Sequence, residues 1–298
     1  MPSSRVRLRA LLPTVTLPLT LALATLAAPV SAAPAVAERC ASTSATGFPA
    51  RRTRAPSGSA FAARIARLDE QQREAAILEQ VLKGNVPGFL RHFRPVRLEL
   101  SKPGKPRQVA IVCVMPDYLA IGSDDDFVRV PVNRYTADRI ARELDFILPT
   151  RKLVDAIYRQ SSIHLPPVPM PPGPRMRSTE YYVAHNKTIA RQERAAGIHP
   201  GVLVAGHKKD LVLSNKLARH PNRVAIYGWH HADGKPIQPL STVHGARYAD
   251  YSHGLRLVSR VILLNGKQTR AEQVLQDPGL GELLSDEGPL QPGVLADL

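Results

Sequence analysis

The sequence predicts an α+β fold, with a mainly antiparallel sheet and flanking helices. The main observation is that strand-like segments come in clusters, within residues 96–132 and 202–264, instead of alternating one by one with helices. Hairpin-type turn sequences at Asp233-Gly234 and Asn265-Gly266 support antiparallel pairing. The hydrophobic content of 44% is that of a globular chain.

The first half of the chain carries helical and strand-like patterns in turn. Apolar residues recur at three- and four-residue spacings over 60–83, which predicts a helix that ends at Gly84-Asn85. Thr136 and Thr150 are typical N-caps and predict two further helices, over 136–144 and 150–160. Short apolar or alternating runs predict four strands, at 97–100, 109–114, 118–121 and 127–130.

A proline-rich segment precedes the second half. Six prolines fall within residues 166–174, so this stretch is extended and stiff, either as a linker or as a strap over the surface. Beyond it we expect helices at 179–196 and 270–276. The strands expected here are 202–205, 211–214, 224–229 and 255–264.

The N-terminus is typical of a secretory signal peptide. Three arginines precede a nearly uncharged stretch over residues 10–30, and small residues suited to cleavage follow at Ser31-Ala32-Ala33 and again at 35–37. The alternative, a membrane anchor, is disfavoured because Pro13 and Pro18 interrupt the apolar stretch. No later segment is long and apolar enough to span a membrane, so none is expected after signal removal. The predicted organisation is a signal peptide at 1–33, a disordered arm at 34–58, an α+β region at 59–165, the proline-rich segment at 166–176, and a second α+β region at 177–298.

The net charge and the cysteine content suggest the compartment of the protein and the class of molecule that it binds. The formal net charge of +15 attracts polyanions, and export makes an anionic envelope polymer or a peptidoglycan-type substrate a better candidate than nucleic acid. We therefore expect a secreted or periplasmic protein. The two cysteines, Cys40 and Cys113, are expected to form a disulfide in such an oxidising compartment.

Candidate site residues concentrate in the second half of the chain. Seven of the ten histidines and the only tryptophan, Trp229, lie between residues 199 and 253. Imidazoles close to carboxylates are suited to acid–base catalysis or to metal binding. The candidate catalytic residues are His207, His244, Asp250, Ser252 and His253. The candidate substrate-binding residues are Lys208, Trp229, Tyr248 and Arg256, with Arg256 expected to hold an anionic group and Trp229 to offer a stacking face.

One possible role of these residues is to bind a zinc ion. His244, Asp250 and His253 are the right residue types for three zinc ligands, with His207 as a further imidazole. The segment resembles zinc DD-carboxypeptidases, in which a Ser-x-His is followed by a glycine and a nearby aspartate. It departs from them because Ser241 precedes His244 by three residues and the spacing from histidine to aspartate is one residue short.

The letters Ser252-His253-Gly254-Leu255-Arg256-Leu257, with His244-Gly245 upstream, resemble the signature of L,D-transpeptidases. The signature of that family is His-Gly followed, later in the chain, by Ser-His-Gly-Cys-x-Arg. The resemblance implies an exported protein that acts on peptidoglycan, but it covers only about fifteen residues. Leu255 stands where the family has its nucleophilic cysteine, and leucine cannot attack a carbonyl, so cysteine chemistry is excluded at this position.

Two other interpretations stay open at this point. Ser252 or Ser241 could be a nucleophile beside a histidine, with Asp250 or Asp210 orienting the base. Alternatively, the histidines are structural and bond the backbone within loops. The interpretation we carry forward is an exported hydrolase that acts on an envelope or extracellular polymer through the His/Asp-rich site. Its alternative is a non-catalytic basic envelope protein that binds anionic polymer.

Overall fold

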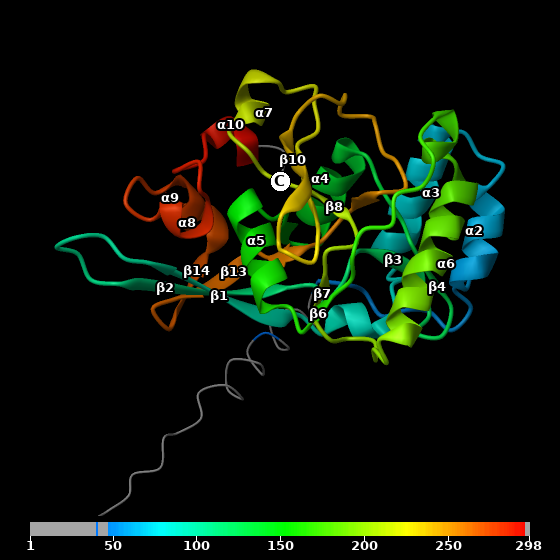
Figure 1. The fold of residues 1–298 in the computed structure, drawn as a ribbon, viewed down its shortest axis with the longest axis horizontal. Helices are drawn as coiled ribbons and strands as arrows, with labels where there is room; N and C mark the ends of the chain where they lie inside the picture. Colours follow the sequence, from blue (N-terminus) through cyan, green and yellow to red (C-terminus); the bar gives the residue numbers. More distant parts are fainter. Residues whose placement is uncertain (1–39, 41–46, 296–298) are drawn as a thin grey trace, which may run out of the picture. The chain divides into compact units, whose positions relative to one another are not determined.

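The largest sheet in the described part of the chain is an antiparallel sheet built around strand β2, which we call the central sheet; β1, β2, β13 and β14 lie at the lower left of Figure 1. The structure is a computed structural model that describes Cys40 and residues 47–295. Within that part of the chain the central sheet has six strands, in the order β14-β13-β2-β12-β5, with β1 paired to the other side of β2. All of its pairs are antiparallel, which confirms the predicted α+β class. The strands of this sheet are β1 (Arg94–Leu100), β2 (Gln108–Val114), β5 (Phe146–Ile147), β12 (Val258–Ser259), β13 (Val261–Leu264) and β14 (Lys267–Arg270).

A second sheet carries the candidate site. Its described strands run in the order β10-β9-β8-β11, and the pairing of β11 with β8 is parallel whereas the others are antiparallel. Two small two-stranded sheets complete the strand content of residues 47–295. The strands outside the central sheet are β3 (Ala120–Gly122), β4 (Phe127–Arg129), β6 (Ile163–His164), β7 (Val204–Ala205), β8 (Lys209–Leu211), β9 (Ile226–His230), β10 (Pro236–Ser241) and β11 (His253–Gly254).

Helices flank these sheets. Helix α5 packs against both β1 of the central sheet and β9 of the second sheet, while α2 and α6 lie side by side (Figure 1). No helix within residues 47–295 combines the length and apolar character that crossing a membrane requires. The helices are α2 (Gly58–Ile65), α3 (Glu70–Leu82), η1 (Gly88–Arg91), α4 (Arg134–Glu143), α5 (Arg151–Gln160), η2 (Pro174–Arg177), α6 (Thr179–Ala195), α7 (Lys216–Arg219), α8 (Ala271–Gln276), α9 (Gly281–Leu284) and α10 (Pro292–Leu295).

For two of the predicted helices, the capping residues in the structure show a helix start that differs from the prediction. The helical pattern over 60–83 is split into α2 and α3 because Asp69 starts a new helix, with a capping box to Gln72. The cap of α4 is Asn133, whose side chain accepts from the Thr136 amide, so Thr136 lies inside the helix. The predicted cap of α5 is confirmed, because Oγ1 of Thr150 accepts from the amide of Leu153 at 3.2 Å.

The proline-rich segment does not separate two cores. Strands from both sides of it, β2 before and β13 after, lie next to each other in the central sheet. The segment is a strap, held by a hydrogen bond of 2.7 Å from the amide of Met170 to the hydroxyl of Tyr251. Because Tyr251 lies two residues before His253, the strap passes close to the candidate site.

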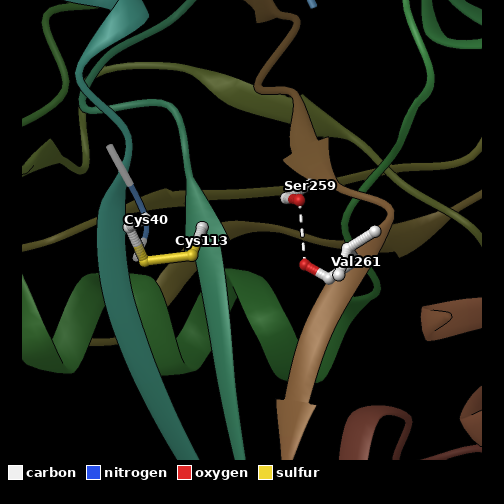
Figure 2. Close-up of a disulfide and its surroundings, with 4 residues drawn as sticks. All are labelled: Cys40, Cys113, Ser259 and Val261. Carbon is white, nitrogen blue, oxygen red and sulfur yellow. Dashed lines mark hydrogen bonds between the residues drawn. A yellow bond between two sulfur atoms is a disulfide. The ribbon is translucent and has the colours of Figure 1, made fainter. Parts of the chain in front are cut away.

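The expected disulfide between Cys40 and Cys113 is present (Figure 2). Both cysteines are buried, and Cys113 belongs to the central strand β2, so the bond fixes the N-terminal segment to the middle of the sheet. In the same region, the hydroxyl of Ser259 donates to the carbonyl of Val261 across the bend between β12 and β13 (Figure 2).

The predicted disordered arm is ordered over residues 47–57. Phe48 is buried against the ring of Phe146, with the ring centroids 5.3 Å apart. Arg51 donates to the Asn85 side chain at 2.9 Å and to the Gly122 carbonyl at 3.0 Å. Composition alone indicated disorder here because these partners lie far away in the sequence. The predicted signal peptide lies outside the described residues.

Candidate functional site

Two distant segments meet where β11 pairs with β8. In this parallel pair His253 lies beside Lys209, and the Ser252 carbonyl accepts from the Lys209 amide at 2.8 Å. The next residue, Gly254, packs so close to Tyr118 that an added Cβ would lie 2.4 Å from its ring. The Ser-His-Gly sequence therefore has a structural basis: glycine allows the close packing, and the pairing fixes the position of the histidine.

Asp250 is the buried carboxylate of the site. Its Oδ1 accepts from the amide of Ser252 at 2.8 Å and from the hydroxyl of Ser252 at 2.5 Å, while its Oδ2 accepts from the hydroxyl of Tyr248 at 3.0 Å. Burial raises the pKa of Asp250, but His253, the Ser252 donors and Lys209 outweigh it and lower that pKa to about 2. Asp250 is thus an oriented, ionised carboxylate at neutral pH.

His253 is fully buried, yet neither of its ring nitrogens has a hydrogen-bond partner within the described chain. Its Nε2 lies 4.0 Å from Oδ2 of Asp250, which is too far for a hydrogen bond. Burial lowers the pKa of His253 to about 4, with Asp250 opposing the change and Lys209, His244 and Lys208 adding to it. The ring is therefore neutral at pH 7, with one N–H and one lone pair unused. Buried groups of this kind call for water or a ligand as a partner.

His244 and Tyr248 form the partly exposed side of the same group. Their rings stack with centroids 4.0 Å apart and an angle of 9° between the planes. The centroid of His253 lies 6.4 Å from that of His244 and 5.6 Å from that of Tyr248. Burial lowers the pKa of His244 as well. The structure thus brings together five predicted residues, which we call the His253 cluster: His244, Tyr248, Asp250, Ser252 and His253.

Within the cluster, Ser252 holds the carboxylate. Its hydroxyl is fully buried and donates to Asp250, not to an imidazole. A serine nucleophile needs a histidine that accepts its proton, and this geometry does not provide one for Ser252. The hydroxyl and amide of Ser252 together fix the position of the Asp250 carboxylate.

His207 lies in a separate hydrogen-bonded group. Its Nε2 is 3.0 Å from Oδ1 of Asp117, and Oδ2 of Asp117 accepts from Arg129 at 2.5 Å. Burial lowers the pKa of His207 to about 4 although Asp117 opposes this. Asp117 is thus the hydrogen-bond partner of His207, and within the described residues no hydrogen bond joins His207 to the His253 cluster, so its expected convergence with the other imidazoles stays a prediction.

Arg256 is placed differently from the expectation. It is buried, and its Nη1 and Nη2 donate to the carbonyls of Met115 and Val204, each at 2.7 Å. The guanidinium lies 4.4 Å from the ring centroid of Tyr118, and its Nε is 3.9 Å from Oδ1 of Asp210. Arg256 connects strand ends inside the protein, so it is not positioned to hold an anion from outside.

Lys208, which precedes β8, and Lys209, its first residue, have different surroundings. Lys208 is buried, and its ammonium donates to the Tyr251 carbonyl at 2.5 Å. Burial, with a contribution from Arg129, lowers the pKa of Lys208 to about 7. Lys209 is partly buried, with its Nζ 5.1 Å from the ring centroid of Trp229. Sequence reasoning did not select Lys209; the signal for it is the strand alternation, which puts adjacent lysines on opposite faces.

The structure offers no support for zinc. Within Cys40 and residues 47–295 there is no group of three or more His, Cys, Asp or Glu side chains that could hold a metal ion. In the His253 cluster, the carboxylate that would be one ligand already accepts three hydrogen bonds, from Ser252 and Tyr248.

The arrangement is suited to proton transfer. It combines an ionised carboxylate, a neutral imidazole with both nitrogens unused, and a partly exposed histidine and tyrosine. No protein-family model, no curated protein and no solved structure matches the chain, so any proposal about its function depends on this geometry.

Proposed function

We propose that the protein is an exported hydrolase that acts on an anionic polymer of the cell envelope or the extracellular space, with His253 as its acid–base group. The observation that carries this proposal is the imidazole of His253, which is buried beside an ionised carboxylate and has no hydrogen-bond partner on either nitrogen within the described residues. A histidine held for structural reasons alone would normally have its nitrogens satisfied by the chain.

In the proposed reaction, neutral His253 accepts a proton from water as the water oxygen bonds to the electrophilic centre of the substrate. The imidazolium that forms is stabilised by Asp250, whose charge is held in place by Ser252 and Tyr248. The same imidazole then gives the proton to the leaving group as the scissile bond breaks. His244, partly exposed and stacked on Tyr248, forms the solvent-facing side of the cluster, from which we expect a substrate to approach.

Export and the choice of substrate rest on the charge and on the cysteines. The disulfide is compatible with a secreted or periplasmic protein, because such bonds persist in oxidising compartments. The formal charge of +15 favours a substrate with many negative charges, and peptidoglycan, which carries carboxylates, fits this class.

Digestion of purified peptidoglycan sacculi in heavy-oxygen water tests the proposal. Hydrolysis releases soluble fragments and incorporates one heavy oxygen atom per bond cleaved, on the product that held the electrophilic centre, as measured by mass spectrometry. Release of fragments with no heavy oxygen in any product would indicate a transferase or lyase and would contradict the proposal. Co-sedimentation with sacculi without any release would favour the alternative, a non-catalytic basic protein that binds anionic envelope polymer.

A further inference from the structure

Lys209 is a partly buried cation that forms no salt bridge within the described residues. Its ammonium also makes no hydrogen bond there; it lies over the face of Trp229, 5.1 Å from the ring centroid, and Asp250 acts on it only through space. Lys208 differs, because its ammonium donates to the Tyr251 carbonyl. A cation that is partly removed from water and held over an indole is well placed to receive an anion.

The strand register places this cation at the His253 cluster. Lys209 and His253 lie directly beside each other in the parallel pairing of β8 with β11, and residues paired in this way point to the same face of the sheet. The electrostatic influence of Lys209 reaches the cluster, since it lowers the pKa values of both Asp250 and His253. A ligand group bound at Lys209 would therefore lie next to the imidazole.

The backbone at Trp229 supports a role for its ring. Trp229 has a φ of +58°, in the left-handed region that residues other than glycine rarely adopt, and its amide donates to the Lys208 carbonyl at 3.0 Å. Such backbone strain concentrates at functional sites, where the surrounding structure holds it in place. The indole Nε1 is also buried without an acceptor in the described chain, so this neighbourhood has a second unused donor.

We propose that Lys209, supported by Trp229, binds an oxyanion of the substrate, a carboxylate or a phosphate, directly beside His253. This inference deepens the proposed function and depends on it for the identity of the substrate. It transfers to Lys209 the role that the sequence suggested for Arg256, whose guanidinium is committed to internal carbonyls.

Trp229 is the only tryptophan, so its fluorescence reports directly on this position. The full chain is titrated with sodium acetate and, separately, with inorganic phosphate, at an ionic strength kept constant with sodium chloride. We expect a saturable fluorescence change with at least one of them, and the tighter ligand identifies the preferred oxyanion. Lys209→Met should weaken binding by about tenfold to hundredfold, the range for a hydrogen bond to a charged group. Lys187→Met, which removes an exposed lysine on α6, should not change it.

A second measurement uses the wild-type protein alone, so it does not depend on the folding of a variant. The rate of amine acylation is followed at each lysine by mass spectrometry, and the bound anion should slow acylation at Lys209 but not at Lys187.

The variant His253→Gln separates this inference from the proposed function. It should keep the fluorescence response to the anion even where it abolishes hydrolysis. An absent response, an equal response in Lys209→Met, or equal protection at both lysines would overturn the inference.

Discussion

Replacing His253 with glutamine should make the stability of the protein less sensitive to acid. The pKa of His253 is lowered from its ordinary value of 6.5 to about 4, mainly by burial, so the unfolded chain takes up this proton at a higher pH than the folded one. The stability is therefore fully present above pH 6.5 and is lost progressively as the pH falls towards 4. The charged and titratable groups around the ring are Asp250, Lys209, His244 and Lys208.

The size of the effect follows from this difference in pKa. At about 1.36 kcal/mol per pKa unit, the change from 6.5 to about 4 corresponds to about 3 kcal/mol. His207 contributes in the same direction, since its pKa is also lowered to about 4. Glu74 contributes in the opposite direction, because burial raises its pKa to about 7. Both groups are present in wild type and variant, so their contributions cancel in the difference between the two proteins.

Urea denaturation at pH 7, 6, 5 and 4 measures this difference. Between pH 7 and pH 4 the wild type should lose about 3 kcal/mol more of its free energy of unfolding than His253→Gln does. If the two stability curves run parallel over this range, His253 is not held neutral in the folded state and the reasoning is refuted.

Three further predictions concern the stability of the fold and the export of the protein. Replacing both Cys40 and Cys113 with alanine should lower the free energy of unfolding by about 4 kcal/mol, because the bond closes a loop with a sequence separation of 73; an unchanged urea midpoint would contradict this. Arg256→Met should cost about 3 kcal/mol or more by the same assay, since it leaves two buried carbonyls and Asp210 without their cation; a loss below about 1 kcal/mol would argue against that role. N-terminal sequencing of secreted protein should begin between residues 34 and 38, and an intact Met1 in the cytoplasm would exclude export.

The fold class could be predicted because it depends on local patterns. The apolar run of β2 and the clustering of strands are visible in the sequence, and they give the central antiparallel sheet. The break between α2 and α3 was missed because the helical periodicity continues across it, although Asp69 and Gln72 form a recognisable capping box. The order of residues 47–57 could not be predicted, since it depends on Asn85 and Gly122, which are distant in sequence.

The same distinction between local and distant partners applies to the site. His244, Asp250 and His253 were predicted together because they lie within one short segment that folds back on itself. The positions of His207 and Arg256 depend on Asp117 and Met115, which belong to the first half of the chain. No spacing rule connects residues so far apart, so their chemistry could be recognised in the sequence but their place could not.

The most direct test of the central claim compares two buried histidines. His230 is the matched control: it is buried and stacked on Tyr158, but its Nε2 has a partner, Asp155, at 3.1 Å. The release of soluble fragments from sacculi is measured for wild type, His253→Gln and His230→Gln, each normalised to the folded fraction from circular dichroism. His253→Gln should lose about a hundredfold or more of the activity, the usual contribution of a general base, while His230→Gln should keep it. A folded His253→Gln protein with wild-type activity would contradict the claim.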